Sequence, residues 1–152
     1  MSEARILVLG YGNPGRQDDG LGPAMAIAIE RLALPNVTAH ENYQLVIEDA
    51  LDVAEHDVVW FVDASKAGPT PYFVSDLSPS PSIAFTSHAV EPEVILAIAR
   101  TYFGGSPRAF LLGIRGYAFE FVEEITSGAR DNLNVAFAML RQRIVLHAGA
   151  GP

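Results

Sequence analysis

One stretch of the chain, residues 5–22 (R-I-L-V-L-G-Y-G-N-P-G-R-Q-D-D-G-L-G), limits the possible folds more than any other. It begins with an unbroken apolar run at positions 6–9, which is typical of a strand buried on both faces of a parallel sheet. Five glycines follow within thirteen residues, together with the acidic pair Asp18 and Asp19. Pro23 and a helical spacing of apolar residues come next. This stretch therefore predicts a strand, a glycine-rich acidic loop and a helix.

Three interpretations of the loop are open. A dinucleotide-binding fingerprint, G-x-G-x-x-G, is matched by Gly10, Gly12 and Gly15. Glu41 would then be the acid that holds the ribose. Asp18 and Asp19 argue against this, because carboxylates at a helix start repel phosphate and attract a cation. In the third interpretation, one of the two aspartates only caps the helix.

The length and composition describe a single globular domain. The chain has 152 residues, of which 49% are hydrophobic and 18% are charged. This is enough material for a hydrophobic core. We expect one α/β domain over residues 1–147 and a disordered tail over residues 148–152.

The charge and the missing cysteines exclude several classes of function. A formal net charge of −8 argues against nucleic-acid partners and against an anionic membrane surface. No cysteine is present, which excludes disulfides, thiolate metal sites and cysteine nucleophiles. The apolar runs are too short to span a bilayer or to act as a signal peptide. We therefore expect a cytoplasmic protein with no nucleic-acid or membrane partner.

The rest of the sequence alternates short apolar runs with amphipathic segments. The expected strands are residues 37–40, 58–62, 72–74 (an edge strand), 83–86 and 109–114. The expected helices are residues 42–54, 91–102 and 126–146. This order predicts a three-layer α/β fold, in which a twisted, mostly parallel sheet of about five strands has helices on both faces.

Polar residues follow several of these strands. Asp19 follows the first strand, Asp63 ends the strand at 58–62, and His88 precedes a helix. Since ligands bind at the carboxyl ends of parallel strands, these side chains are expected at one edge of the sheet. Two carboxylates and one imidazole suit a divalent transition-metal ion. The simpler alternatives are that Asp63 binds its own loop, that His88 is a surface residue, and that Arg115 pairs with an acid and does not hold a substrate carboxylate.

These motifs, in this order, resemble the hydrogenase maturation endopeptidases of [NiFe] hydrogenases. The resemblance extends from about Arg5 to Ile144 and rests on four segments: G-Y-G-N-P-G-R-Q-D-D-G-L-G, Y-Q-L, F-V-D-A and S-H-A-V-E-P. One departure lies in residues 119–128, where Val122 and Glu124 replace glycines of relatives. This departure is expected to alter the substrate-facing rim and to leave the metal residues unchanged.

The resemblance implies a specific activity. Members of the family remove a short C-terminal extension from the large-subunit precursor of a [NiFe] hydrogenase once nickel has been inserted. It implies that Asp19, Asp63 and His88 are the nickel-contacting and catalytic residues, with nickel carried by the substrate and other divalent ions able to occupy the site. We expect a monomer. Two alternatives stay open, a nucleotide-binding module that uses residues 10–15 and a binding paralogue without activity.

Overall fold

A single five-stranded sheet organises the molecule, with the strand order β2-β1-β3-β5-β4. The structure is a computed structural model that describes residues 4–83 and 90–150, the last four of these by backbone alone. The strands are β1 (Ile6–Tyr11), β2 (Val37–Asn42), β3 (Val58–Ser65), β4 (Tyr72–Leu77) and β5 (Arg108–Arg115). All neighbouring pairs are parallel except β4 and β5, which are antiparallel. The predicted mostly parallel sheet of about five strands is confirmed.

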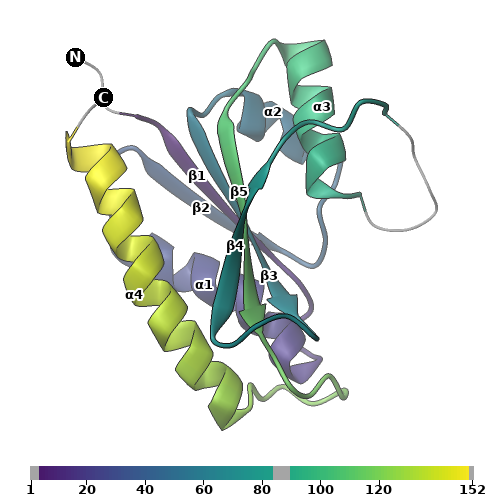
Figure 1. Cartoon of the computed structure of the whole chain (residues 1–152), viewed down its shortest axis with the longest axis vertical. Coiled ribbons are helices and arrows are strands. Elements are labelled where there is room, and N and C mark those ends of the chain that lie inside the picture. The colour runs from purple at the N-terminus through teal and green to yellow at the C-terminus, as the bar shows by residue number, and fades with distance from the viewer. Residues whose placement is uncertain (1–3, 84–89, 151–152) are drawn as a thin grey trace.

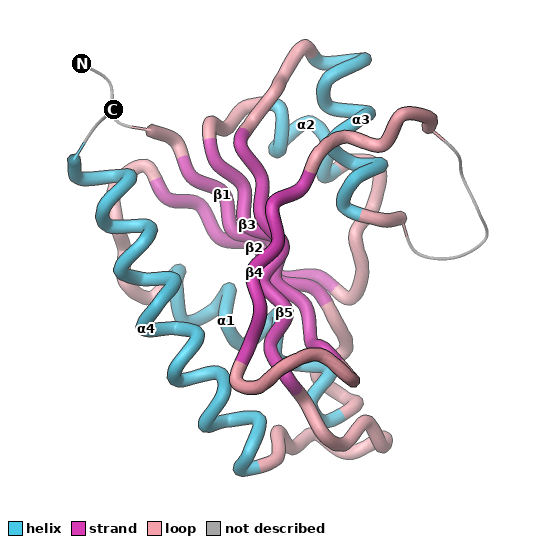
Figure 2. Tube along the Cα trace, in the orientation of Figure 1, coloured by secondary structure: helices cyan, strands magenta, loops and turns pink. Residues whose placement is uncertain are grey.

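Helices cover both faces of this sheet (Figure 1). The elements are the 3-10 helix η1 (Gln17–Gly20) and the α-helices α1 (Leu21–Glu30), α2 (Asp49–Ala54), α3 (Pro92–Phe103) and α4 (Ser127–Ala150). The core on one face packs α1 and α4 against the strands, and the core on the other face packs α2 and α3. Figure 2 shows the sheet between the two helical layers. The predicted three-layer α/β arrangement is confirmed.

The alternation of side chains along the strands divides the core in two. Ile6 and Val8 of β1 point to the α1 and α4 side, whereas Leu7 and Leu9 point to the α2 and α3 side. Both sets are buried, which explains why β1 reads as a continuous apolar run and shows no polar alternation.

Two glycines bring the first strand and the first helix unusually close. A Cβ on Gly10 would lie 2.0 Å from the backbone oxygen of Gly22 at the start of α1. Gly12 has a φ of 143°, and a Cβ there would lie 2.0 Å from the backbone oxygen of Asp19. Only glycine tolerates the backbone conformation at position 12 and the close backbone contacts at positions 10 and 12. The glycines at positions 10 and 12 therefore have a structural reason in the turn between β1 and α1.

Several predicted boundaries were wrong. Residues 42–54 are not one helix, because β2 extends to Asn42 beside β1 and α2 begins only at Asp49. β3 does not stop before Asp63 but pairs with β5 as far as Ser65. α4 runs to Ala150, so residues 148–150, expected in a disordered tail, are helical. Of the strand expected at 83–86, Ile83 is not in a strand and the other positions lie outside the described residues.

No helix in the described ranges is both long enough and apolar enough to span a bilayer.

Candidate active site

The loop between β1 and α1 holds Asp19 in a fixed orientation. The side-chain oxygen of Asn13 accepts a hydrogen bond from the amide of Gly15 at 2.9 Å, which closes a tight turn. The carboxylate of Asp19 in turn accepts a hydrogen bond from the amide of Asn13 at 2.7 Å. Asp19 is half-buried on η1, the short helix that follows this turn. Its carboxylate is therefore oriented by the loop that β1 carries.

Asp63 lies within β3, on the α2 and α3 side of the sheet. Its strand neighbours with the same orientation, Val59 and Phe61, belong to the core on that side. Burial raises the pKa of Asp63 to about 7, although a hydrogen bond from the amide of Ala64 opposes the rise. The negative charge of Asp19 raises this pKa further. The two carboxylates that the sequence singled out therefore lie close enough to interact electrostatically.

Two further side chains share this neighbourhood, and the sequence analysis did not identify them. Burial raises the pKa of Tyr11, and the negative charges of Asp63, Glu91 and Glu93 add to that effect. Glu91, just before α3, also raises the pKa of Asp63. The register explains the position of Tyr11, because Gly10 pairs with Val62 and the next residues on each strand are level. That pairing is not visible in the sequence.

His88 lies outside the described residues, so its convergence with Asp19 and Asp63 stays a prediction. Among the residues that the structure does describe, no three His, Cys, Asp or Glu side chains are grouped so that they could hold a metal ion.

Asp18, the neighbour of Asp19, has a structural role. It is fully buried, and its carboxylate accepts hydrogen bonds from the amides of Tyr117, Ala118 and Thr126 and from the Thr126 hydroxyl. Burial acts to raise the pKa of Asp18, but these hydrogen bonds outweigh it and hold the pKa below its usual value. The N-cap of α1 is Gly20, without a side-chain bond, so the idea that an aspartate caps this helix was wrong.

We had expected Arg115 to pair with an acid, but it forms no such pair with any residue that the structure describes. Its guanidinium donates hydrogen bonds to the carbonyl oxygens of Gly68, at 2.7 Å, and Gly116, at 3.1 Å. It also lies over the ring of Tyr117, 5.2 Å from the centroid. Arg115 thus joins the segment after β3 to the segment after β5.

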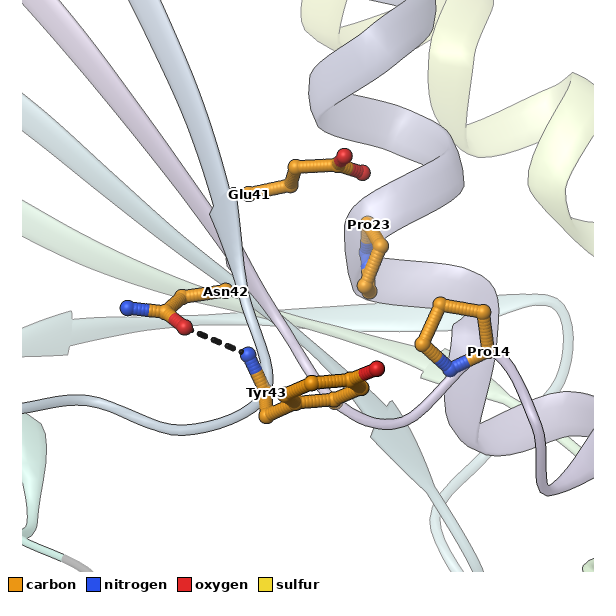
Figure 3. A pocket seen from close by; sticks show the side chains of 6 residues that line it. Pro14, Pro23, Glu41, Asn42 and Tyr43 are labelled. Atoms are coloured by element: carbon orange, nitrogen blue, oxygen red, sulfur yellow. Dashed lines mark hydrogen bonds between the residues drawn. The ribbon is translucent and has the colours of Figure 1, made fainter.

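A pocket of about 270 Å³ opens beside the loop between β1 and α1, at the carboxyl end of β2 (Figure 3). Figure 3 shows the side chain of Glu41 extending from β2 toward α1, with Tyr43 and Pro14 below it. Glu41 is thus near the glycine loop, as a ribose acid would be. The rest of the fingerprint does not fit, because protein atoms fill the space beside Gly10 and Gly12 and the helix begins only at Leu21.

The fold and these carboxylates define an α/β protein with an acidic site at the carboxyl edge of its sheet. Solved structures with this fold include hydrogenase maturation proteases, and their likeness to this chain confirms the resemblance at the level of the fold. The endopeptidase HybD from E. coli has a TM-score of 0.73 and 21% identity, with 95% of this chain and 94% of that chain covered. The protease HycI from Thermococcus kodakarensis has a TM-score of 0.72 and 21% identity, with 92% of each chain covered.

A third structure is the hydrogenase 2 maturation peptidase from a Thaumarchaeota archaeon, with a TM-score of 0.70 and 24% identity. It covers 93% of this chain and 99% of its own. No protein-family model matches the sequence, and no curated protein matches it.

Proposed function

We propose that this protein is an endopeptidase that removes the C-terminal extension of a [NiFe] hydrogenase large-subunit precursor after nickel insertion. In this proposal Asp19, Asp63 and His88 contact the nickel carried by the precursor, which positions the scissile peptide beside them. The protein acts as a monomer in the cytoplasm.

The single observation that carries the proposal is the electrostatic pairing of Asp19 and Asp63 at the carboxyl edge of the sheet. A carboxylate whose pKa is raised by the charge of a neighbouring carboxylate belongs to a site that favours a cation or a proton. The fold shared with solved maturation proteases supports the nature of the substrate.

The chemistry of Asp63 fits this role. A carboxyl group with a pKa of about 7 exchanges its proton readily at neutral pH. It can release that proton when a cation arrives, or accept one from a water molecule that attacks the peptide. The chain has no cysteine to act as a nucleophile instead. Nickel in the substrate would polarise the water or the peptide carbonyl.

Processing of nickel-loaded and nickel-free precursor by the purified protein tests the proposal, on a gel that resolves the short extension. We expect cleavage of the nickel-loaded precursor only, and loss of cleavage in Asp19→Asn, Asp63→Asn and His88→Ala. Asp76→Asn is the matched control, because Asp76 is an exposed acid on β4 that pairs with Phe110, toward the other end of the sheet. Equal cleavage of both precursors, or full activity of His88→Ala, would refute the proposed mechanism.

A further inference from the structure

The exposed apolar side chains of this protein are unevenly distributed. In the part of the chain that the structure describes, the large ones outside helices all follow β2 or β5: Tyr43, Ile47, Tyr117, Phe121 and Val122. Both segments leave the sheet at its carboxyl edge. We call these five residues the docking rim.

The docking rim flanks the candidate site on two sides. In the sheet, β1 and β3 lie between β2 and β5. The strands that carry Asp19 and Asp63 are therefore the central ones, and the rim residues follow the strands on either side of them. With neighbouring strands about 4.8 Å apart, β2 and β5, the strands from which the two parts of the rim extend, are separated by roughly 14 Å.

The part of the rim after β5 is held in place by the site loop. The amide of Gln17 donates a hydrogen bond to the carbonyl oxygen of Val122 at 2.8 Å. Arg16 lies over the ring of Phe121, 5.0 Å from its centroid. The buried carboxylate of Asp18 binds the amide of Tyr117. Exposed aromatic rings fixed in this way lose little conformational freedom on binding, which favours their use in an interface.

We propose that the docking rim binds the folded body of the precursor, outside the segment that is cut. This inference rests on the proposed function, because that function makes the partner a protein. The three aromatic residues, each half or more exposed out of roughly 150–250 Å², offer on the order of 400 Å². With Ile47 and Val122 they supply the larger part of the roughly 800 Å² per partner of a standard interface. A peptide seated in the neighbouring pocket of about 270 Å³ would leave most of this surface uncovered.

The charges around the rim indicate the chemistry of the partner surface. Exposed carboxylates alternate with the apolar residues, at Glu41, Glu120, Glu123 and Glu124. Arg16 and Arg115 lie over the rings of Phe121 and Tyr117, so each of these charges faces a ring of the rim. The rim therefore fits an apolar patch that is surrounded by basic side chains.

The chain offers closely matched controls for a test. Tyr43 is 70% exposed and Tyr102 is 69% exposed, but Tyr102 lies on α3, just before the connection that leads into the amino end of β5. The control for Phe121, which is 81% exposed, is Phe103, which lies on α3 next to Tyr102 and is 50% exposed. Substitution of any of these exposed residues by serine leaves the buried core intact.

The experiment measures initial cleavage rates over a range of nickel-loaded precursor concentrations. We expect Tyr43→Ser and Phe121→Ser each to raise KM roughly tenfold with little change in kcat, the size typical of an interface aromatic. Tyr102→Ser and Phe103→Ser should behave as the wild type. A synthetic peptide that covers only the cleaved segment should bind the wild type, Phe121→Ser, Tyr102→Ser and Phe103→Ser equally in fluorescence anisotropy. Tyr43→Ser is left out of this comparison because Tyr43 also lines the pocket.

The outcomes separate this inference from the proposed function. If the wild type cleaves the precursor but the rim variants match their controls, the docking rim is wrong and the proposed function stands. Peptide binding that is as tight as precursor binding would also overturn the rim. A wild-type protein that neither binds nor cleaves the precursor would overturn both.

Discussion

Replacement of Asp18 by asparagine should destabilise the protein strongly, although only one atom of the side chain changes. The carboxylate is fully buried and accepts four hydrogen bonds, from three amides and one hydroxyl. Three of these donors bind Oδ2 and only the amide of Thr126 binds Oδ1, so an asparagine that keeps its oxygen at the Oδ2 position turns its NH2 group toward the Thr126 amide. One hydrogen bond to a charged acceptor is lost, at about 1.5–3 kcal/mol, and one buried amide is left without an acceptor, at about 1–3 kcal/mol, so we expect a loss of about 3–5 kcal/mol.

Thermal and urea unfolding at pH 7 measure this effect. For a chain of this size the loss corresponds to a fall in Tm of roughly 10 °C. Asp131→Asn is the control, since Asp131 is an exposed acid on α4 and its change should stay within about 0.5 kcal/mol.

The pH dependence of the stability difference between the wild type and Asp18→Asn tests whether the charge of Asp18 is the cause. The pKa of Asp18 is lower in the folded protein than its usual value, so its contribution is complete above about pH 4 and is lost as the pH falls through the folded pKa. The gap between the wild type and Asp18→Asn should therefore close in acid. Equal stability of the two proteins at pH 7, or a gap that persists below the folded pKa, would refute the reasoning.

Three other perturbations have defined outcomes. Because the pKa of Asp63 is raised to about 7, its contribution to stability is complete below about pH 4 and is lost as the pH rises through 7. Asp63→Asn should therefore be more stable than the wild type at pH 8.5, by about 1–2 kcal/mol in urea unfolding. The difference in stability between the two proteins should be smaller at pH 5.5. Gly12→Ala should cost about 3 kcal/mol or prevent folding, whereas Gly104→Ala, at φ 70° with open space around it, should cost about 1 kcal/mol. Thr126→Val should cost about 1–3 kcal/mol by calorimetry, because the hydroxyl of Thr126 bonds both Asp18 and the amide of Ala129 in the first turn of α4.

The sequence was sufficient to predict the elements whose pattern is set locally. The apolar runs of β1, β3 and β5 are buried on both faces, so they appear as uninterrupted hydrophobic stretches. The helix α3 was predicted almost to the residue, since Pro92 lies at its start and Gly104 ends it in a left-handed conformation. Asp19 and Asp63 were predicted to lie near each other because both follow or end central parallel strands.

The features that were missed depend on contacts between distant parts of the chain. Residues 42–54 have a helical apolar pattern, but pairing with β1 keeps the first of them in β2. Asp18 was taken for a possible helix cap because its partners are 99 to 108 residues away in sequence. The proximity of Tyr11 to Asp63 depends on strand register, which a single sequence does not specify.

The antiparallel strand β4 forms an outer edge of the sheet, and its surroundings bear on solubility. Such an edge exposes unpaired amides and carbonyls, which can recruit a strand of another molecule and start aggregation. Here prolines stand on both sides of the strand, at positions 69, 71, 79 and 81. Because proline cannot donate a ladder hydrogen bond, the edge available to a second molecule ends with the six residues of β4. The prolines thus shorten the edge on which a strand of a second molecule can pair, and so lower the tendency of this sheet to grow by addition of strands.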